Sequence, residues 1–226
     1  MLLASCAYML TPVIAVLRKQ GIPFHNPYRK SNGIWNPLRH GPNGSSMDRV
    51  LSLVGGGPWT HRDLKLWAEW LKAKGNLRTG AKALLDASDD TLPATPECLN
   101  ALFEADAVES LLAARDDSRL LLHWWSSRVA SSFHKRVQFP VAVALARGPA
   151  ALEESPRVIV GTIHSVKGGE ADVVFLFPDL SRAGDAAYQK NGPERDSVIR
   201  LFYVGMTRAR HTLYLCQSES SMAVVL

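Results

Sequence analysis

The spacing of apolar residues along the 226-residue chain changes twice, near residue 35 and near residue 155. At the start, Leu2 to Ser5 resembles the end of a buried strand, and a helix follows with Thr11 as its expected N-cap and Gly21 at its end. The segment IPFHN then predicts a second short strand. A strand, helix, strand unit implies a parallel sheet. Because two short strands make no stable sheet, we expect its other strands elsewhere in the chain.

Residues 36–155 follow a helical period, with no convincing strand alternation. Helices are expected from Ser46, from Thr60, within TGAKALLDAS, within TPECLNALFEADAVESLLAA, where Thr95 is the expected N-cap, and within DDSRLLLHWWSSRVASS. All six tryptophans fall within this region or at its edge. A base-stacking platform is one interpretation, and packing between amphipathic helices, which the spacing of Trp67 and Trp70 favours, is the other.

After residue 155 strands return, expected at Arg157 to Gly161 and at Asp172 to Phe177. The second is a nearly continuous apolar run, as in a strand buried on both faces. ERDSVIRLFYVGMTRAR predicts a helix with Ala209 on its apolar stripe, and Thr212 to Cys216 predicts a last strand. The pattern therefore predicts an α/β fold in which residues 1–35 and 156–226 form a parallel sheet domain and residues 36–155 form a helical insertion.

Composition narrows the class of protein. The chain is 46% hydrophobic and its apolar runs fall far short of the roughly 20 residues of a membrane span. MLLASCAYML lacks a basic region and is expected to be core strand, not a signal peptide. Three isolated cysteines without metal-ligand spacing predict a reducing, cytoplasmic setting and no structural zinc.

The net charge of +5 permits a polyanionic partner. Ser126 to Gly148 contains no acidic residue and five basic ones: Arg128, His134, Lys135, Arg136 and Arg147. This segment is either a phosphate-facing surface or a solvated helix face, and the sequence leaves both open.

Two segments combine polar residues and glycines in a way that a core does not explain. The first is the loop after the strand at 157–161, with Thr162, His164, Ser165, Lys167 and Glu170. Its glycines, Gly168 and Gly169, follow the lysine and a strand comes next, so the loop is not the phosphate cradle G-x-x-x-x-G-K-[ST]. The second is the helix RLFYVGMTRAR, with Thr207, Arg208 and Arg210 on its last expected turn.

Together these segments resemble motifs V and VI of UvrD-like superfamily 1 DNA helicases. Motif V there looks like T-x-H-x-x-K-G-x-E-a-x-x-V, matched by Thr162, His164, Lys167, Gly168, Glu170, Ala171 and Val174. Motif VI looks like R-L-x-Y-V-x-x-T-R-A, matched by Arg200, Leu201, Tyr203, Val204, Thr207, Arg208 and Ala209. Residues 1–35 also resemble the start of the second RecA-like domain of that family, so the sheet is expected to be a partial RecA-like sheet.

The resemblance assigns a role to each matching residue. Arg208 is expected at the γ-phosphate of ATP as an arginine finger, and Glu170 at the ribose, with Gly168 beside them in the ATP-binding loop. Thr162 and His164 are expected to contact single-stranded DNA, together with Ser165 and Lys167, although Lys167 either reaches a phosphate or holds the loop. The cofactors implied are ATP and Mg²⁺ in the intact helicase.

The departures from the family pattern limit this expectation. The chain contains no G-x-x-x-x-G-K-[ST] and no apolar strand that ends in an Asp-Glu pair. The resemblance therefore implies a partner, the N-terminal RecA-like motor domain, and the chain alone is not expected to hydrolyse ATP. Two alternatives remain open, a non-catalytic DNA-binding or adaptor module and an inert remnant that has lost its motor.

Overall fold

The computed structural model describes residues 1–29, 33–41, 44–55 and 57–225. The chain divides into two compact units, a sheet unit of Met1–Leu17, Ile22–Pro37 and Ser155–Leu226, and a helical unit of Arg18–Gly21 and Leu38–Glu154.

The sheet unit contains five parallel strands among its described residues, in the order β2-β3-β1-β4-β5. They are β1 (Leu2–Ala4), β2 (Phe24–His25), β3 (Val158–Thr162), β4 (Ala171–Leu176) and β5 (Ala209–Leu215). The helices are η1 (Ala7–Leu10), α1 (Thr11–Lys19), η4 (Ile163–Val166), α9 (Arg182–Tyr188) and α10 (Pro193–Met206), with the last turn of α1 assigned to the helical unit. The α/β class and the parallel sheet are confirmed.

Strand β1 lies between β3 and β4, so the sheet joins the two ends of the chain. Leu2 pairs with Val160 on one side and with Phe175 on the other. The backbone amide of Phe175 donates to the carbonyl of Met1 at 2.9 Å. The first four residues are therefore central to the sheet.

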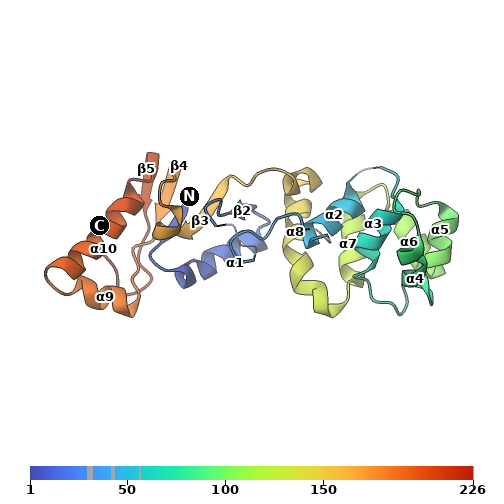
Figure 1. Ribbon diagram of the computed structural model, residues 1–226, viewed down its shortest axis with the longest axis horizontal. Coiled ribbons are helices and arrows are strands. Elements are labelled where there is room, and N and C mark those ends of the chain that lie inside the picture. The colour runs from blue at the N-terminus through green and yellow to red at the C-terminus, as the bar shows by residue number, and fades with distance from the viewer. Residues whose placement is uncertain (30–32, 42–43, 56, 226) are drawn as a thin grey trace. The chain divides into compact units, whose positions relative to one another are not determined.

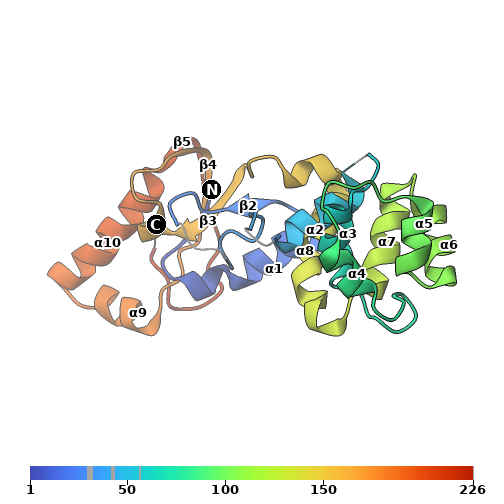
Figure 2. The same cartoon turned by 45° about the vertical axis from the view of Figure 1, so that its right-hand side comes forward.

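Helix α10 covers one face of the sheet (Figure 2). Phe202 is fully buried and packs in a core with Leu3, Val174 and Leu176. A Cβ at Gly205 would lie 3.0 Å from Leu176 and 3.3 Å from Ile163, so a glycine allows the helix to approach the sheet and η4 closely.

The opposite face of β4 is not covered by the sheet unit, so the expectation that this strand is buried on both faces was wrong. Val174 and Leu176 are buried, whereas Val173 and Phe175 are each 36% exposed. Phe175 stacks on Tyr214 of β5, with ring centroids 4.8 Å apart, and Tyr214 is itself exposed. Within the described residues of this unit, the apolar run therefore has a buried side and an open side.

The helical unit contains α2 (Ser46–Val54), α3 (His61–Ala68), α4 (Ala81–Ala87), α5 (Pro96–Leu102), α6 (Ala105–Ala114), α7 (Ser118–Arg128), η2 (Ser131–Phe133), α8 (His134–Arg147) and η3 (Pro149–Leu152) (Figure 1). Helices α2 and α3 each begin with a capping box, at Ser45 with Asp48 and at Thr60 with Asp63. Trp59, Trp67, Trp70, Trp124 and Trp125 are buried. Packing between helices therefore accounts for five of the six tryptophans.

Three element boundaries differ from the prediction. Thr11 is not an N-cap, because η1 leads directly into α1 and Thr11 already has helical backbone angles. The predicted helix after Thr95 is two helices, because Phe103 takes an extended conformation and pairs with Leu77. Helix α10 ends at Met206, and Ala209 lies in β5, where it pairs with Ala171 of β4.

Among the residues that the structure describes, no helix is long and apolar enough to cross a membrane. Cys6, Cys98 and Cys216 are free thiols. Across the same described ranges, His, Cys, Asp and Glu side chains form no cluster of three that could hold a metal ion.

Candidate functional site

The loop that joins β3 to β4 begins with two side chains that hold its own backbone. Thr162 is 8% exposed and its hydroxyl accepts from the backbone amide of Ser165 at 3.2 Å. The Ser165 hydroxyl donates to the Thr162 carbonyl at 2.9 Å. Ile163 and Val166 of η4 are fully buried in the core beneath. Thr162 and Ser165, both predicted DNA contacts, are thus placed where they close the turn.

His164 and Lys167 are the predicted DNA contacts that the loop exposes to solvent. Both border a hollow of about 550 Å³ between the loop, α9 and α10. Apolar side chains of Val198, Leu201 and Val204 also line it, and Arg200 and Glu194 add a charge of each sign. The surface at this point is therefore an apolar hollow with three basic side chains and one acidic side chain around it.

The glycine pair after Lys167 serves two different purposes. Gly168 has a φ of +84°, which a residue with a Cβ rarely adopts, although no atom would crowd a Cβ there. Gly169 has ordinary backbone angles, but a Cβ there would collide with the hydroxyl end of Tyr28. Gly168 therefore sets the direction of the loop, and Gly169 leaves room for an aromatic ring from another segment.

Arg208 links the helix that matches motif VI to the loop that matches motif V. Its Nε donates to the carbonyl of Val204 at 2.9 Å, near the end of α10, where carbonyls lack helical partners. Its Nη1 donates to the carbonyl of Gly169 at 3.2 Å, and its Nη2 to the hydroxyl of Thr207 at 3.0 Å. The guanidinium is half-buried and spans the two segments.

Glu170 lies next to this contact and faces solvent. The backbone amide of Ala171 donates to the carbonyl of Arg208 at 2.9 Å, so Glu170 and Arg208 immediately precede paired strand positions. The Glu170 carboxylate accepts from Nε of Arg210 at 3.2 Å, and both side chains are more than half exposed. An ion pair in that setting is weak, so the carboxylate remains available to another donor.

Asn26 is a residue that the sequence pattern did not single out. It follows β2 and is completely buried, and its Nδ2 donates to the carbonyl of Val160 at 3.0 Å and to the hydroxyl of Ser165 at 3.2 Å. Its backbone amide donates to Oδ1 of Asn36 at 2.9 Å. The available signal was the repeated Asn-Pro dipeptide at 26–27 and 36–37, because buried asparagines at turns carry specific hydrogen bonds.

The described residues fit part of a nucleotide site. A carboxylate that accepts hydrogen bonds suits a ribose hydroxyl, and a guanidinium suits a phosphate oxygen. Glu170 and Arg208 supply these two groups at adjoining positions. The loop lacks the glycine and lysine order of a phosphate cradle, so these residues fit no more than one side of a nucleotide site.

The basic segment 126–148 is largely committed to the helical unit. Arg128 lies over Trp124 with 4.9 Å to the ring centroid, and the His134 ring contacts the Val129 carbonyl at 2.7 Å. Arg147 donates to the carbonyl of Gly21 at 2.9 Å. Lys135 and Arg136 are exposed on α8, and Arg136 also lies over Phe133. The structure therefore favours the solvated helix face over a phosphate-facing surface.

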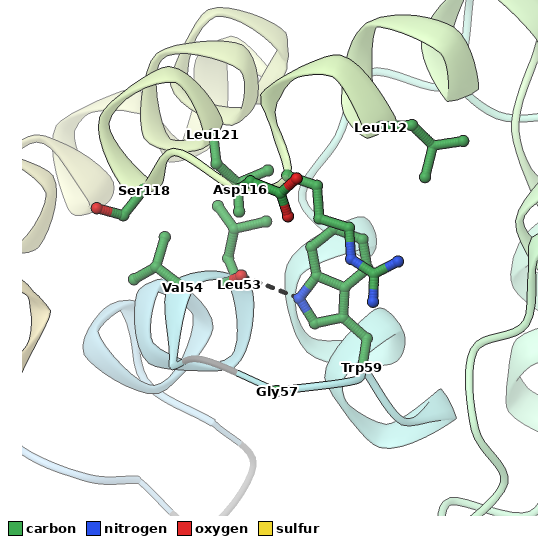
Figure 3. Close-up of a pocket in the computed structure, with 9 residues that line it drawn as sticks. Leu53, Val54, Gly57, Trp59, Leu112, Asp116, Ser118 and Leu121 are labelled. Carbon is green, nitrogen blue, oxygen red and sulfur yellow. Dashed lines mark hydrogen bonds between the residues drawn. The ribbon is translucent and has the colours of Figure 1, made fainter.

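A second hollow, of about 660 Å³, lies in the helical unit around Trp59 (Figure 3). The indole Nε1 of Trp59 donates to the Leu53 carbonyl at 2.9 Å, and Arg115 lies 5.4 Å from the ring centroid. The ring is 7% exposed, so little of its face is open to a stacked base. Apart from Trp59, one of the six tryptophans considered for base stacking, none of the residues predicted to contact ATP or DNA lies in this hollow.

A parallel sheet that the chain enters twice, interrupted by a helical unit, is consistent with a partial RecA-like fold. Residues 157–216 match the family model described as the UvrD-like helicase C-terminal domain. The resemblance drawn from the loop and the α10 segment is thereby confirmed for residues 157–216. A search of curated proteins found no match, and a search of solved structures found none either.

Proposed function

We propose that the chain is the C-terminal part of an ATP-dependent DNA helicase, in which it forms one side of the nucleotide site and one part of the path of single-stranded DNA. The observation that carries the proposal is the contact between Arg208 and Gly169, which joins the two segments matched by the family model. Its cofactors would be ATP and Mg²⁺, held mainly by an N-terminal RecA-like motor domain.

In this proposal Arg208 acts as the arginine finger. A guanidinium neutralises the charge that develops on the transferred phosphoryl group. Glu170 accepts from the nucleotide ribose, and Gly168 gives the loop the turn that places this carboxylate at its end. Without a phosphate cradle and a metal site, the chain alone is not expected to hydrolyse ATP.

DNA binding in this proposal falls mainly to the exposed side chains of the loop. Lys167 and His164 contact phosphates of single-stranded DNA, and Thr162 and Ser165 support the turn from within. The loop would therefore touch DNA through its first half and the nucleotide through Glu170. Such a shared element is what couples two ligands thermodynamically.

The first test measures binding of a fluorescent oligothymidylate to the chain by anisotropy at several salt concentrations. Lys167→Ala is expected to weaken binding and to lower the slope of log K against log salt by about 0.7, the value for one phosphate on a single strand. The matched control is Lys190→Ala, which removes an exposed lysine from the segment between α9 and α10. Unchanged affinity and slope in the Lys167 variant would contradict the proposed DNA path.

A non-catalytic DNA-binding module is the second candidate. Lys135 and Arg136 are exposed basic residues of segment 126–148 that would support it. This module would be favoured over a helicase part by two results together. Substitution of both residues would abolish oligothymidylate binding, and Lys167→Ala would leave that binding unchanged. We expect the reverse result, since Arg128, His134 and Arg147 each contact another residue of the helical unit and the segment offers few uncommitted basic side chains.

A further inference from the structure

Tyr28 lies against the loop that carries His164 and Lys167. It follows the turn after β2, and its backbone amide donates to Oδ1 of Asn26 at 3.1 Å. Its hydroxyl end occupies the space beside Gly169 that a side chain would otherwise fill. The tip of this ring is therefore seated on the loop backbone.

Tyr28 is nevertheless partly open to solvent. The residue is 45% exposed, which is unusual for an aromatic side chain fixed at both its backbone and its tip. A ring held in this way loses little conformational freedom when a flat ligand stacks on it. Tyr28 thus presents a fixed aromatic surface and does not complete a core.

Asn26 joins Tyr28 and the loop into one piece. Its side-chain oxygen accepts from the amide of Tyr28, and its side-chain nitrogen donates to the hydroxyl of Ser165. Ser165 directly follows His164 in the loop. Asn26 is completely buried, so water does not compete for these bonds. The position of the aromatic ring is therefore set relative to the loop residues proposed to contact phosphates.

The charges around Tyr28 indicate the class of ligand. Arg29 follows it directly and is exposed, with its guanidinium over the ring of Trp35. Lys167 and His164 are exposed on the loop that Tyr28 meets at Gly169. An exposed ring against a loop that carries basic side chains suits an unpaired base, because every base has a π face and each nucleotide carries a phosphate.

We propose that Tyr28 is a stacking position for one base of single-stranded DNA, whose backbone is contacted by Lys167 and His164. The proposal rests on the proposed function, since it adds a base-binding residue to the same DNA path. In this proposal Gly169 leaves room for the Tyr28 ring, because any larger residue at that position would displace the ring.

The test compares two oligonucleotides of equal length, an oligothymidylate and one with abasic sites, titrated against the full chain by anisotropy. The wild-type chain is expected to bind the thymidylate several-fold more tightly. Tyr28→Ala is expected to lose roughly tenfold in affinity for the thymidylate and little for the abasic strand. Tyr28→Trp should keep the preference, and Tyr214→Ala, which removes an exposed tyrosine of β5, should leave both affinities unchanged.

Three outcomes would overturn the inference. Equal affinity of the wild-type chain for both strands would exclude base stacking, and an equal loss on both strands in Tyr28→Ala would show that the ring only holds the loop. In either case a lower affinity in Lys167→Ala would leave the proposed function in place. Absence of binding to both strands by the wild-type chain would overturn the proposed function and this inference together.

Discussion

Each guanidinium nitrogen of Arg208 donates to an oxygen of the sheet unit, two of them backbone carbonyls. A guanidinium carries five N–H groups, so two of them remain for a phosphate. A hydrogen bond between neutral and charged groups contributes on the order of 1.5–3 kcal/mol, and a bond from arginine to phosphate is stronger still because both groups are charged. The three bonds within the sheet unit can therefore hold the guanidinium in place while its remaining N–H groups bind a phosphate.

Substitution of Arg208 tests the proposed catalytic role. In an assembly of the chain with the motor domain that completes the site, Arg208→Ala is expected to lower DNA-stimulated ATP hydrolysis by about 10³-fold or more, because the developing charge loses its partner. Arg182→Ala, which removes an exposed arginine of α9, is the matched control. Anisotropy should report nearly unchanged DNA binding in both variants, and normal turnover in Arg208→Ala would show that another residue is the finger.

The sequence pattern did not predict how individual side chains of the loop are oriented. The motif match selected Thr162 and Ser165 with His164 and Lys167, but it cannot tell which of four polar side chains face inward. That depends on η4, whose turn brings the Ser165 amide to the Thr162 hydroxyl. Asn26 was missed because an isolated asparagine has no period, and the two acceptors of its side-chain amide, Val160 and Ser165, lie more than 130 positions away.

At the scale of elements, Asn26 connects the segment after β2 to the loop after β3. Asn26→Ala would leave the buried Val160 carbonyl without this donor and remove the partner of the Ser165 hydroxyl. We expect a loss of about 1–3 kcal/mol in the free energy of unfolding. Urea denaturation followed by circular dichroism measures it, with the exposed Asn191→Ala as the control. A change no larger than that of the control would mean that Asn26 contributes little.

The capping box of α2 predicts a dependence on pH. Burial of Asp48 opposes ionisation, but backbone amides of Ser45 and Gly41 and the side chains of His40 and Ser45 outweigh it and lower the pKa of Asp48. A lowered folded-state pKa means that the stabilisation is present above the ordinary value of 3.8 and is lost as the pH falls through the folded value.

Unfolding midpoints in urea at pH 6 and pH 3 measure this effect. The wild-type helical unit is expected to lose more stability on acidification than the Asp48→Asn variant, which lacks the titrating group. Asp86→Asn, which removes an exposed carboxylate of α4, should behave like the wild type. Identical acid sensitivity in Asp48→Asn and the wild type would contradict the assignment.

Most elements were predictable because apolar spacing and capping residues agree locally. Thr60 with Asp63 begins α3, and Gly21 follows the end of α1, as their residue types indicate. Elsewhere the pattern fits two structures equally well. TRARHTLYL continues the stripe of α10 and also suits a strand, and the pairing of Ala209 with Ala171, which is a tertiary contact, decides for β5.

At the scale of the whole molecule, the sheet unit is assembled from both ends of the chain. β1 pairs with β3 and β4, from which it is separated in sequence by the whole helical unit. The change of period along the sequence predicts a helical insertion within a sheet domain, since helical and strand periods differ. The sequence did not show that one face of β4 is exposed, because a strand buried on one face and a strand buried on both faces can each carry a continuous apolar run.

The open face of β4 and β5 has a practical consequence for anyone who handles this protein. Val173, Phe175 and Tyr214 form an apolar strip, and the dye anilinonaphthalene sulfonate binds such surfaces in fully folded chains as well as in molten globules. We expect the native chain to enhance the dye's fluorescence while its buried tryptophans give a strong near-ultraviolet circular dichroism signal. Phe175→Ser should reduce the first signal and spare the second, so dye fluorescence alone would misreport a well-folded preparation as a denatured one.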